Sequence, residues 1–385
     1  MKHGLLLLFA LWQLLLGAQI QPAAHRTELY FPLLKNKKVA LLVNQTATIG
    51  RVHLVDSLQR AGINVVRIFA PEHGFRGTAD AGAHIADGTD KKTGIPIVSL
   101  YGKKQQPSAD DLRGIDILVF DIQDVGCRFY TFLSTLHYVL QACADNQLPL
   151  MVLDRPNPNG DYFDGPMLDT AFRSFVGVAP VPVVHGLTLA EYATMARGEG
   201  WIAGAASLQL TTICCKNYTH RKRYWLPVPP SPNLRNGRAV EWYPSLCFFE
   251  GTNVSVARGT DFPFQAVGSP VMTVDSPFTF TPTSKPGAVD PPFKNRRCYG
   301  FDLRQKVASA RPRQLNLEIL LQCYAAFGKK DSFFLPNHFF DKLAGTDQLR
   351  KQVLAGVSAQ EIRNSWKKDL EKYGLLRRKY LLYVE

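Results

Sequence analysis

The apolar positions beyond residue 36 fall into short runs separated by amphipathic segments. The runs contain β-branched residues and end in polar or glycine-rich stretches, which is typical of buried strands. Segments between them, such as VHLVDSLQRAG (52–62) and RFYTFLSTLHYVLQACADNQ (128–147), carry apolar residues at helical spacing. Buried strands that alternate with helices predict an α/β fold, with a mostly parallel, doubly wound sheet covered on both faces. The predicted strands include KKVALLV (37–43), NVVRIFA (64–70), IPIVSLY (95–101), DILVFDI (116–122) and LPLMVLD (148–154).

The pattern changes near residue 210. The helix LTLAEYATMARGEG (187–200) and the strand LQLTTI (208–213) complete the first half. Proline-rich and aromatic-rich segments follow, and two helical patterns, LNLEILLQCYAAFG and SAQEIRNSWKKDLEKYG, end the chain. We therefore expect a catalytic domain over residues 25–210 and a second, smaller α+β domain over residues 211–385 that closes a cleft.

The first 24 residues, MKHGLLLLFALWQLLLGAQIQPAA, have a basic start, an apolar core and a small-residue exit. This is the pattern of a secretory signal peptide, so we expect cleavage near residue 18 or 24 and export to the periplasm. The apolar stretch is short for a membrane span and has no longer counterpart, so the mature chain is expected to have no span. An uncleaved N-terminal anchor is the alternative.

Motif and charge patterns narrow the classes of function. The chain lacks G-x-x-x-x-G-K-[ST], H-E-x-x-H and C-x-x-C, and the first predicted βα turn, VNQTATIG, lacks the glycines of a dinucleotide site. We therefore expect neither a cofactor nor a metal. The net charge of +13 favours an acidic partner. Since no nucleic-acid motif is present, an acidic cell-wall polymer suits an exported protein better than DNA; a merely solvated basic surface is the alternative.

Polar side chains follow five consecutive predicted strands. In an open parallel sheet, ligands bind beyond the carboxyl ends of the strands, so we expect these side chains to share one cleft. Helix caps and turns are the alternative explanation for each of them. Carboxylates, amides and arginines are the side chains that suit sugar recognition and glycosidic cleavage. They are Asn44; Glu72, His73 and Arg76; Tyr101; Asp121, Gln123, Asp124 and Arg128; and Asp154 and Arg155.

Glu72 is the candidate general acid. Glycoside hydrolysis usually needs one carboxyl that protonates the leaving oxygen and often a second that acts as nucleophile or base. Glu72 ends an apolar strand in a crowded polar turn, which suits a carboxyl that stays protonated. A helix N-terminal carboxylate or a salt bridge to Arg76 would be the structural alternative. His73 would either orient Glu72 or bind a sugar hydroxyl.

The second catalytic carboxylate is expected to be Asp121, at its strand end, or Glu250 in the second domain. Asp124 precedes a predicted helix and could instead cap it. Asp154 and Arg155 fit a functional pair and a buried structural pair equally well.

The segment YPSLCFFEGTNVSVARGTDFPFQ in the second domain places four polar residues between aromatic groups: Glu250, Asn253, Arg258 and Asp261. Aromatic faces stack on pyranose rings, and arginine can bind a carboxylate through two hydrogen bonds. We expect Arg258 to bind an acidic substituent. An internal ion pair with Asp261 or Glu250 is the alternative.

These residues lie in stretches that resemble a known family, the exo-acting β-N-acetylmuramidases called NamZ, which form glycoside hydrolase family 171. The resemblance extends from about residue 38 to residue 270, and the C-terminal hundred or so residues match by order and size rather than by motif. The matching stretches are LLVNQTA, FAPEHGFRG, SLYG, DILVFDIQDVGCRFYTFLSTL, LDRPNPNG, VHGLTLAEYA, SPNL and YPSLCFFEGTNVSVARGTDFPFQ.

The resemblance implies a Rossmann-like N-terminal domain without a nucleotide, a smaller C-terminal domain and a cleft between them. It also implies release of N-acetylmuramic acid from the non-reducing end of peptidoglycan fragments during cell-wall turnover and recycling. The glutamate of the family's E-H-G motif is the proposed catalytic residue, and Glu72 occupies that position. The lactyl carboxylate of N-acetylmuramic acid would explain Arg76, Arg258 and the basic surface.

Neither the residues nor the resemblance decides the mechanism. Inversion needs carboxyl groups about 6.5–9.5 Å apart and retention about 5 Å, and the substrate's 2-acetamido group is a third candidate nucleophile. An N-acetylglucosaminidase, a wall amidase and a non-catalytic peptidoglycan-binding protein remain the alternative functions.

Overall fold

The structure is a computed structural model that describes residues 19–75, 87–306, 313–328 and 330–385. Arg76 and most of the predicted signal peptide therefore lie outside the described residues.

A seven-stranded sheet forms the core of the first half, in the order β11-β8-β7-β1-β4-β6-β5. Every neighbouring pair is parallel except β5 and β6, so the predicted α/β fold with a mostly parallel sheet is confirmed. All six strand runs predicted from the sequence, LQLTTI included, belong to this sheet. Its strands are β1 (Val39–Val43), β4 (Val65–Ala70), β5 (Gly88–Thr89), β6 (Pro96–Ser99), β7 (Ile117–Asp121), β8 (Leu150–Leu153) and β11 (Leu210–Ile213).

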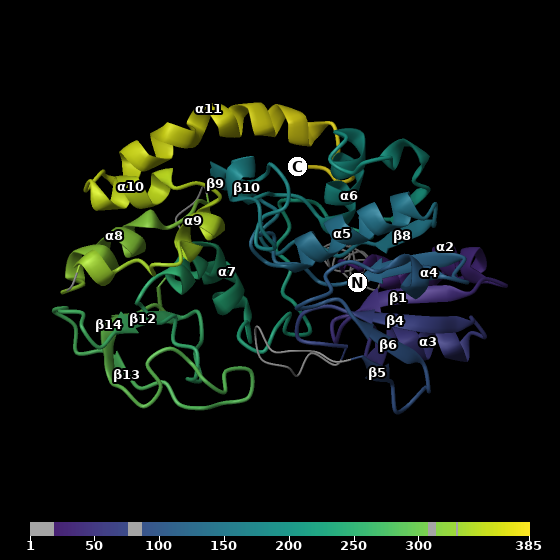
Figure 1. Cartoon of the computed structure of the whole chain (residues 1–385), viewed down its shortest axis with the longest axis horizontal. Coiled ribbons are helices and arrows are strands. Elements are labelled where there is room, and N and C mark those ends of the chain that lie inside the picture. Colours follow the sequence, from purple (N-terminus) through teal and green to yellow (C-terminus); the bar gives the residue numbers. More distant parts are fainter. Residues whose placement is uncertain (1–18, 76–86, 307–312, 329) are drawn as a thin grey trace, which may run out of the picture.

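Helices cover both faces of this sheet (Figure 1). Ala40 and Leu42 of β1 belong to the core that contains α5 and α6. Val39, Leu41 and Val43 point to the opposite face and pack with α2 and α3. This alternation explains the continuous apolar run, because a strand buried on both faces has no solvent side. The helices are α2 (Thr27–Leu34), α3 (Leu54–Arg60), α4 (Ala109–Leu112), α5 (Phe132–Asp145) and α6 (Leu189–Gly198).

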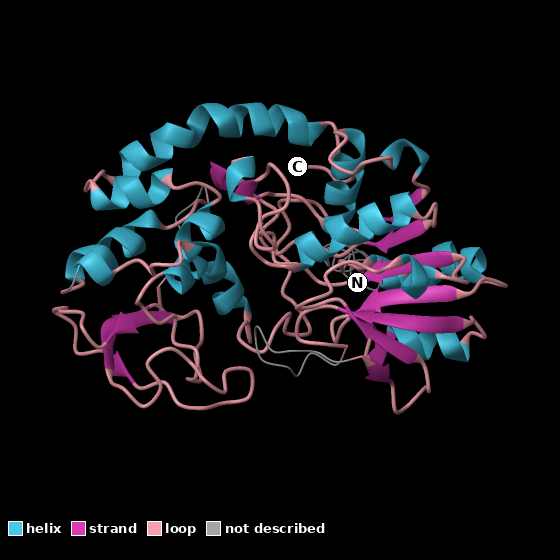
Figure 2. Cartoon of the chain, viewed as in Figure 1, coloured by secondary structure: helices cyan, strands magenta, loops and turns pink. Residues whose placement is uncertain are grey.

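The second half combines a small antiparallel sheet, in the order β12-β14-β13, with helices (Figure 2). Its elements are α7 (Gly237–Leu246), η4 (Cys247–Gly251), β12 (Ala266–Ser269), β13 (Thr279–Phe280), β14 (Cys298–Asp302), α8 (Leu317–Ala326), η5 (Lys330–Ser332), α9 (Phe339–Ala344), α10 (Gln348–Leu354) and α11 (Ala359–Arg378). Short elements complete the fold: η1 (Ala23–His25), β2 (Thr48–Ile49), β3 (Val52–His53), β9 (Asp164–Met167), η2 (Thr170–Phe172), β10 (Pro182–Val184) and η3 (Ala205–Ser207). The domain boundary near residue 210 stays a prediction.

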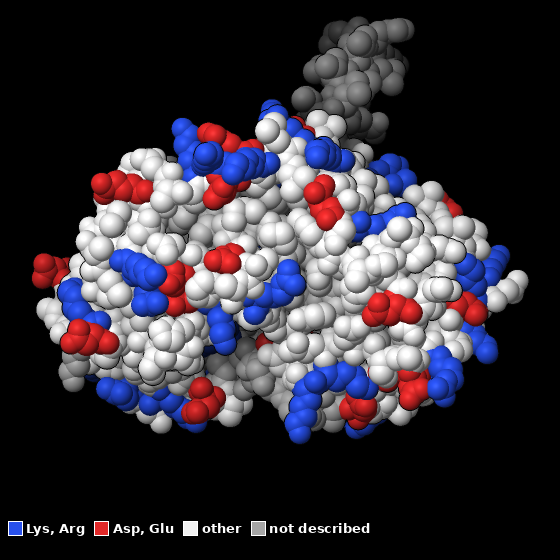
Figure 3. All heavy atoms as spheres, turned by 45° about the horizontal axis from the view of Figure 1, so that its top comes forward, with Lys and Arg blue, Asp and Glu red and all other residues white. Residues whose placement is uncertain are grey.

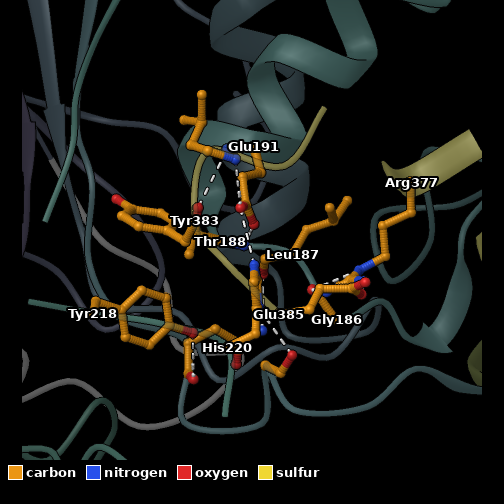
Figure 4. A network of polar contacts seen from close by, with 12 residues as sticks. Gly186, Leu187, Thr188, Glu191, Tyr218, His220, Arg377, Tyr383 and Glu385 are labelled. Atoms are coloured by element: carbon orange, nitrogen blue, oxygen red, sulfur yellow. Dashed lines mark hydrogen bonds and ion pairs between the residues drawn. The ribbon is translucent and has the colours of Figure 1, made fainter. Parts of the chain in front are cut away.

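Helix α11 connects the two halves across one side of the molecule (Figure 1). Its 20 residues span about 30 Å and lead the chain back from the second half to the first. There the last residues join a buried polar network, part of which Figure 4 shows around Glu191 and His220. The Tyr383 hydroxyl donates to Asp154 Oδ2 at 2.6 Å. Glu191 Oε1 lies 3.0 Å from His220 Nε2 and accepts the Leu382 amide at 2.9 Å. The C-terminus therefore fixes the second half against the first.

The surface carries both signs of charge. On the face seen in Figure 3, basic and acidic side chains are interspersed over both halves, and the surface is hollowed between them. Within the described ranges, no helix combines the length and the apolar character needed to cross a membrane.

Candidate active site

The loops at the carboxyl ends of the parallel strands meet through hydrogen bonds. Asn44 follows β1, and its Oδ1 accepts the Thr46 hydroxyl at 2.6 Å. Thr46 Oγ1 in turn accepts the backbone amide of Gln123, which follows β7, at 3.0 Å. Gln123 Nε2 donates to the Pro156 carbonyl beyond β8 at 2.8 Å. The loops after β1, β7 and β8 thus form one connected network, in which Asn44 and Gln123 support the loops.

Two hydroxyl groups hold the carboxylate of Glu72. Tyr101 Oη, from the loop after β6, donates to Glu72 Oε1 at 2.9 Å. Thr131 Oγ1, from the residue that precedes α5, donates to Oε2 at 2.6 Å. Since each oxygen has its own donor, the carboxyl plane is fixed, and the side chain remains half-buried rather than sealed in the core. The structure therefore brings Glu72 and Tyr101 together, as the sequence predicted.

The backbone turns sharply directly after Glu72. His73 and Gly74 both have positive φ, 67° and 77°. This conformation is natural for glycine but costly for histidine, and such strain gathers at functional sites. His73 is buried, so its side chain lies within the protein rather than on the surface.

Asp121 forms a buried ion pair with Arg155. Arg155 Nη2 lies 2.9 Å from Asp121 Oδ2, and Arg155 Nε donates to the other oxygen. The Asp121 side chain is 0% exposed and the Arg155 side chain is 4% exposed. Because both carboxylate oxygens are used, this geometry favours the structural alternative over a catalytic Asp121.

Three other predicted residues, Asp124, Asp154 and Arg128, also have hydrogen-bond partners within the protein. Asp124 Oδ2 accepts the Gly126 amide at 2.6 Å and lies 3.6 Å from His185 Nε2, as expected for a carboxylate that fixes a turn. Asp154 Oδ1 accepts the Ala190 amide at 3.0 Å, and burial raises the pKa of Asp154 to about 7.

Arg128 is fully buried and donates to four backbone carbonyls, those of Pro166, Val181, Leu343 and Ala344, at 2.6–3.1 Å. Burial lowers the pKa of Arg128 to about 9. Because Leu343 and Ala344 belong to α9, this side chain joins the two halves. The structural role is thus favoured for Arg128, and substrate binding by Asp124, Arg128 and Asp154 stays a prediction.

The second half supplies a cavity of about 780 Å³ lined by Glu250, Asn253 and Arg258. Arg258 Nε and Nη2 lie 2.7 and 2.6 Å from Glu250 Oε1, so the internal ion pair that was the alternative to substrate binding is present. Glu250 Oε2 has a weaker contact, with Cys247 Sγ at 3.7 Å. The side chain of Glu250 is 26% exposed. Arginine orients one oxygen of this carboxylate, and the side chain lines a cavity. The carboxylate can therefore contact a substrate bound in that cavity.

The other two predicted residues of this segment differ in position. Asn253 lines the cavity and donates through Nδ2 to the Ser332 carbonyl at 2.7 Å. The Asp261 side chain is 82% exposed and pairs with Lys285 at 2.6 Å. Asp261 therefore does not line the Glu250 cavity as the structure describes it.

Tyr130 and Thr131 were missed by sequence reasoning. Burial and the charge of Asp124 raise the pKa of Tyr130, which also feels the charges of Glu72 and Arg258. Tyr130 is therefore close to both the Glu72 carboxyl and the Arg258 guanidinium. The available signal was a tyrosine and a threonine directly before a long helix, at the same sheet edge as the polar residues.

In the described part of the chain, no group of three or more histidine, cysteine, aspartate or glutamate side chains is arranged to hold a metal ion.

Comparisons with known proteins agree over nearly the whole chain. Residues 39–238 match the family model "Exo-beta-N-acetylmuramidase NamZ, N-terminal", and residues 241–383 match the corresponding C-terminal model. The peptidoglycan β-N-acetylmuramidase NamZ of Bacillus subtilis (strain 168) is 36% identical over 375 residues, which cover 92% of this chain and 89% of that protein.

Two crystal structures of DUF1343 family proteins from Bacteroides fragilis NCTC 9343 share the fold. One is 45% identical with a TM-score of 0.87 and covers 96% of this chain and 100% of that one. The other is 27% identical with a TM-score of 0.79 and covers 94% and 99%. Both halves of this chain therefore belong to the NamZ family of exo-β-N-acetylmuramidases.

Proposed function

We propose that this protein is an exo-acting glycosidase that releases N-acetylmuramic acid from the non-reducing end of peptidoglycan fragments. The observation that carries the proposal is the Glu72 carboxyl, held by two hydroxyl groups at the carboxyl edge of the sheet. Membership of the NamZ family and the activity named for the Bacillus subtilis relative support the substrate. A role in cell-wall turnover and recycling follows as part of the proposal.

The direct test is hydrolysis of a chromogenic β-N-acetylmuraminide compared with the matching β-N-acetylglucosaminide. We expect the muraminide to be cleaved with much the larger kcat/KM. Cleavage of the glucosaminide alone would support an N-acetylglucosaminidase, and release of peptide from intact wall fragments without sugar release would support an amidase. Binding of either glycan without any cleavage would support the non-catalytic alternative.

Glu72 acts in this proposal as the general acid that protonates the glycosidic oxygen. As the bond breaks, positive charge develops at the anomeric carbon, and Glu72 becomes a carboxylate. Tyr101 and Thr131 can donate to that carboxylate through the hydrogen bonds seen in the structure, so the product state of the acid is stabilised where it forms. Hydroxyl groups can also accept from the protonated form, which keeps the carboxyl oriented before the reaction.

Thr131→Val should therefore lower kcat about tenfold, because a hydrogen bond to a charged group contributes about 1.5–3 kcal/mol. Val preserves the shape of the side chain and removes the donor to Glu72 Oε2. KM should change little, and Thr131→Ser should recover most of the activity. Thr194→Val on α6 is the matched control, since its hydroxyl bonds only to a carbonyl of its own helix, at 2.9 Å, in the contacts described. Equal kcat values for Thr131→Val and the wild type would exclude the orienting role.

We propose Glu250 rather than Asp121 as the second carboxylate. Glu250 is partly exposed and lines the cavity, whereas the oxygens of Asp121 are both bonded to Arg155 in the core. Arg258 directs one oxygen of Glu250, so the other can activate water or stabilise the oxocarbenium-like state. In this arrangement Arg258 orients Glu250. Binding of the substrate's lactyl carboxylate by Arg258 or by Arg76 stays a prediction.

Glu250→Gln should lower kcat about 100-fold, since general base catalysis contributes about 10²–10⁴-fold. The amide keeps the size of the side chain but loses the charge that pairs with Arg258. Added azide separates the mechanisms, because a small anion can replace a missing carboxylate and form a glycosyl azide. Glu318→Gln, whose carboxyl is 54% exposed on α8, is the control. If Glu250→Gln had the same kcat as the wild type, Glu250 would not be the second catalytic group, and the 2-acetamido group of the substrate would be the candidate nucleophile instead.

We also propose that the protein is exported to the periplasm and cleaved near residue 18 rather than near residue 24. Ala23 and Ala24 are 0% exposed, and the Ala23 amide donates to the Asp154 carbonyl at 2.9 Å. The Tyr30 hydroxyl donates to the Ala24 carbonyl at 2.7 Å. Cleavage after residue 24 would remove a buried segment from the fold. Intact mass of the protein recovered from the periplasm should give a mature chain that begins close to residue 19; a chain that begins at residue 25, or an uncleaved one, would contradict this assignment.

A further inference from the structure

Three partly exposed aromatic rings follow one another from Glu72. The first is Tyr101, whose hydroxyl donates to Glu72 Oε1 at 2.9 Å. Its ring centroid lies 6.0 Å from that of Phe175 at an interplanar angle of 57°, and Phe175 lies 6.1 Å from Tyr138 with the planes only 5° apart. We call Tyr101, Phe175 and Tyr138 the aromatic row.

Well-ordered elements hold the aromatic row in place. Tyr138 follows Thr131 by about two turns of α5, so both residues lie on the same face of that helix. Phe175 lies in a tight turn closed by two backbone hydrogen bonds of 2.9 Å between Ser174 and Gly177. One end of this face of α5 therefore contacts the catalytic carboxyl, and the aromatic rings lie along it. A surface held in this way binds with little loss of conformational entropy.

We propose that the aromatic row binds the leaving-group part of the glycan chain, the sugars on the reducing-end side of the bond that is cleaved. This inference rests on the proposed function. Aromatic faces stack on the apolar faces of pyranose rings, and stacked rings of this kind contribute binding energy beyond the buried area. The row begins at the carboxyl that protonates the leaving oxygen, so sugars attached to that oxygen pass next to it. Because an exo enzyme encloses only the terminal sugar, partly exposed rings belong to the open, leaving-group side.

The positive charge near the aromatic row favours the binding of an acidic glycan. Arg173 is exposed and lies two residues before Phe175. Burial and the positive charge of Arg173 lower the pKa of His137, the neighbour of Tyr138, to about 4. Arg173 is thus close enough to the far end of the row to attract the carboxylates that muramic acid residues carry along the chain.

The test compares a long substrate with a short one. The long substrate is a tetrasaccharide of alternating N-acetylmuramic acid and N-acetylglucosamine with muramic acid at the non-reducing end. The short one is the chromogenic muraminide, whose leaving group is a single ring. Phe175→Ala should lower kcat/KM for the tetrasaccharide about fivefold, mainly through KM, as expected for one stacking contact. The short substrate should lose less than about twofold, because its leaving group ends before Phe175.

Matched variants separate binding from folding. Phe175→Leu keeps most of the apolar volume but removes the ring face, so it should reproduce the loss on the tetrasaccharide while unfolding near the wild-type temperature. Phe175→Tyr should restore the wild-type values. Phe172→Ala, at a half-buried phenylalanine of the preceding η2, should affect both substrates equally or not at all.

Equal effects of Phe175→Leu on both substrates, or no effect on either, would overturn the inference while leaving the proposed function intact. A wild-type protein that cleaves neither substrate would instead overturn the proposed function. In that case, weaker binding of the tetrasaccharide by Phe175→Leu, measured by calorimetry, would still support the aromatic row as a glycan site.

Discussion

Glu72→Gln is expected to lower kcat on a natural disaccharide with N-acetylmuramic acid at its non-reducing end by about 1,000-fold, within the range that general acid–base catalysis contributes. Glutamine keeps the size of the side chain and can still accept from one of the two hydroxyl groups, Tyr101 or Thr131. It cannot deliver a proton to the leaving oxygen. The loss should therefore appear in kcat, with KM nearly unchanged.

Substrates whose leaving groups differ in their need for a proton test whether Glu72 acts as a general acid. A nitrophenolate needs little protonation, so Glu72→Gln should lose less activity on a nitrophenyl glycoside than on a natural disaccharide. Glu28→Gln on α2, at a carboxyl that is 66% exposed, is the matched control. Thermal unfolding at the wild-type temperature would show that the fold is retained. A variant as active as the wild type on both substrates would remove Glu72 from the reaction.

Arg155→Met is expected to lower the free energy of unfolding by about 3–5 kcal/mol, the usual cost of breaking a buried ion pair from one side. The substitution removes both hydrogen bonds to Asp121 and leaves that carboxylate without its counter-ion at 0% exposure. Equilibrium unfolding in urea, followed by tryptophan fluorescence, gives the difference directly.

The control is the same kind of pair at the surface. Arg304 contacts both oxygens of Asp302, but the two side chains are 43% and 32% exposed. Arg304→Met should therefore cost about 0–1 kcal/mol. The double variant Asp121→Leu with Arg155→Met should recover much of the lost stability, since it removes the uncompensated charge as well. A stable Arg155→Met protein that has lost its activity would favour the catalytic assignment of Asp121.

The sequence predicted the polar turn at Glu72 because local patterns are enough for that purpose. A strand that is apolar at most positions is typically buried in the sheet, and the polar residues that follow it lie at the carboxyl edge of the sheet. Glu72 and Tyr101 could be placed together on this ground, from the ends of β4 and β6. The same reasoning could not tell a residue that faces the cleft from one that faces the core.

Asp121 and Arg128 show that limit. Asp121 is the last residue of β7 and Arg128 lies in the segment after that strand, and both resemble cleft residues in the sequence. Whether a charged group at a strand end meets a substrate, an arginine or four carbonyls depends on segments far away in the chain, such as Leu343 and Ala344 for Arg128. No local pattern contains that information.

The sequence by itself determined the α/β fold, the alternation of strands and helices that makes the sheet mostly parallel, and the turn that carries Glu72. Burial and helical periodicity are local properties of the chain, so the sequence contains them directly. Only the tertiary structure decided which charges are paired and which are available. Thr131 contacts Glu72 across 59 positions of sequence, and Phe175 joins Tyr101 and Tyr138 from a separate loop. Such contacts arise from packing between distant elements, where a hydroxyl or a ring acquires its role from what the fold places next to it.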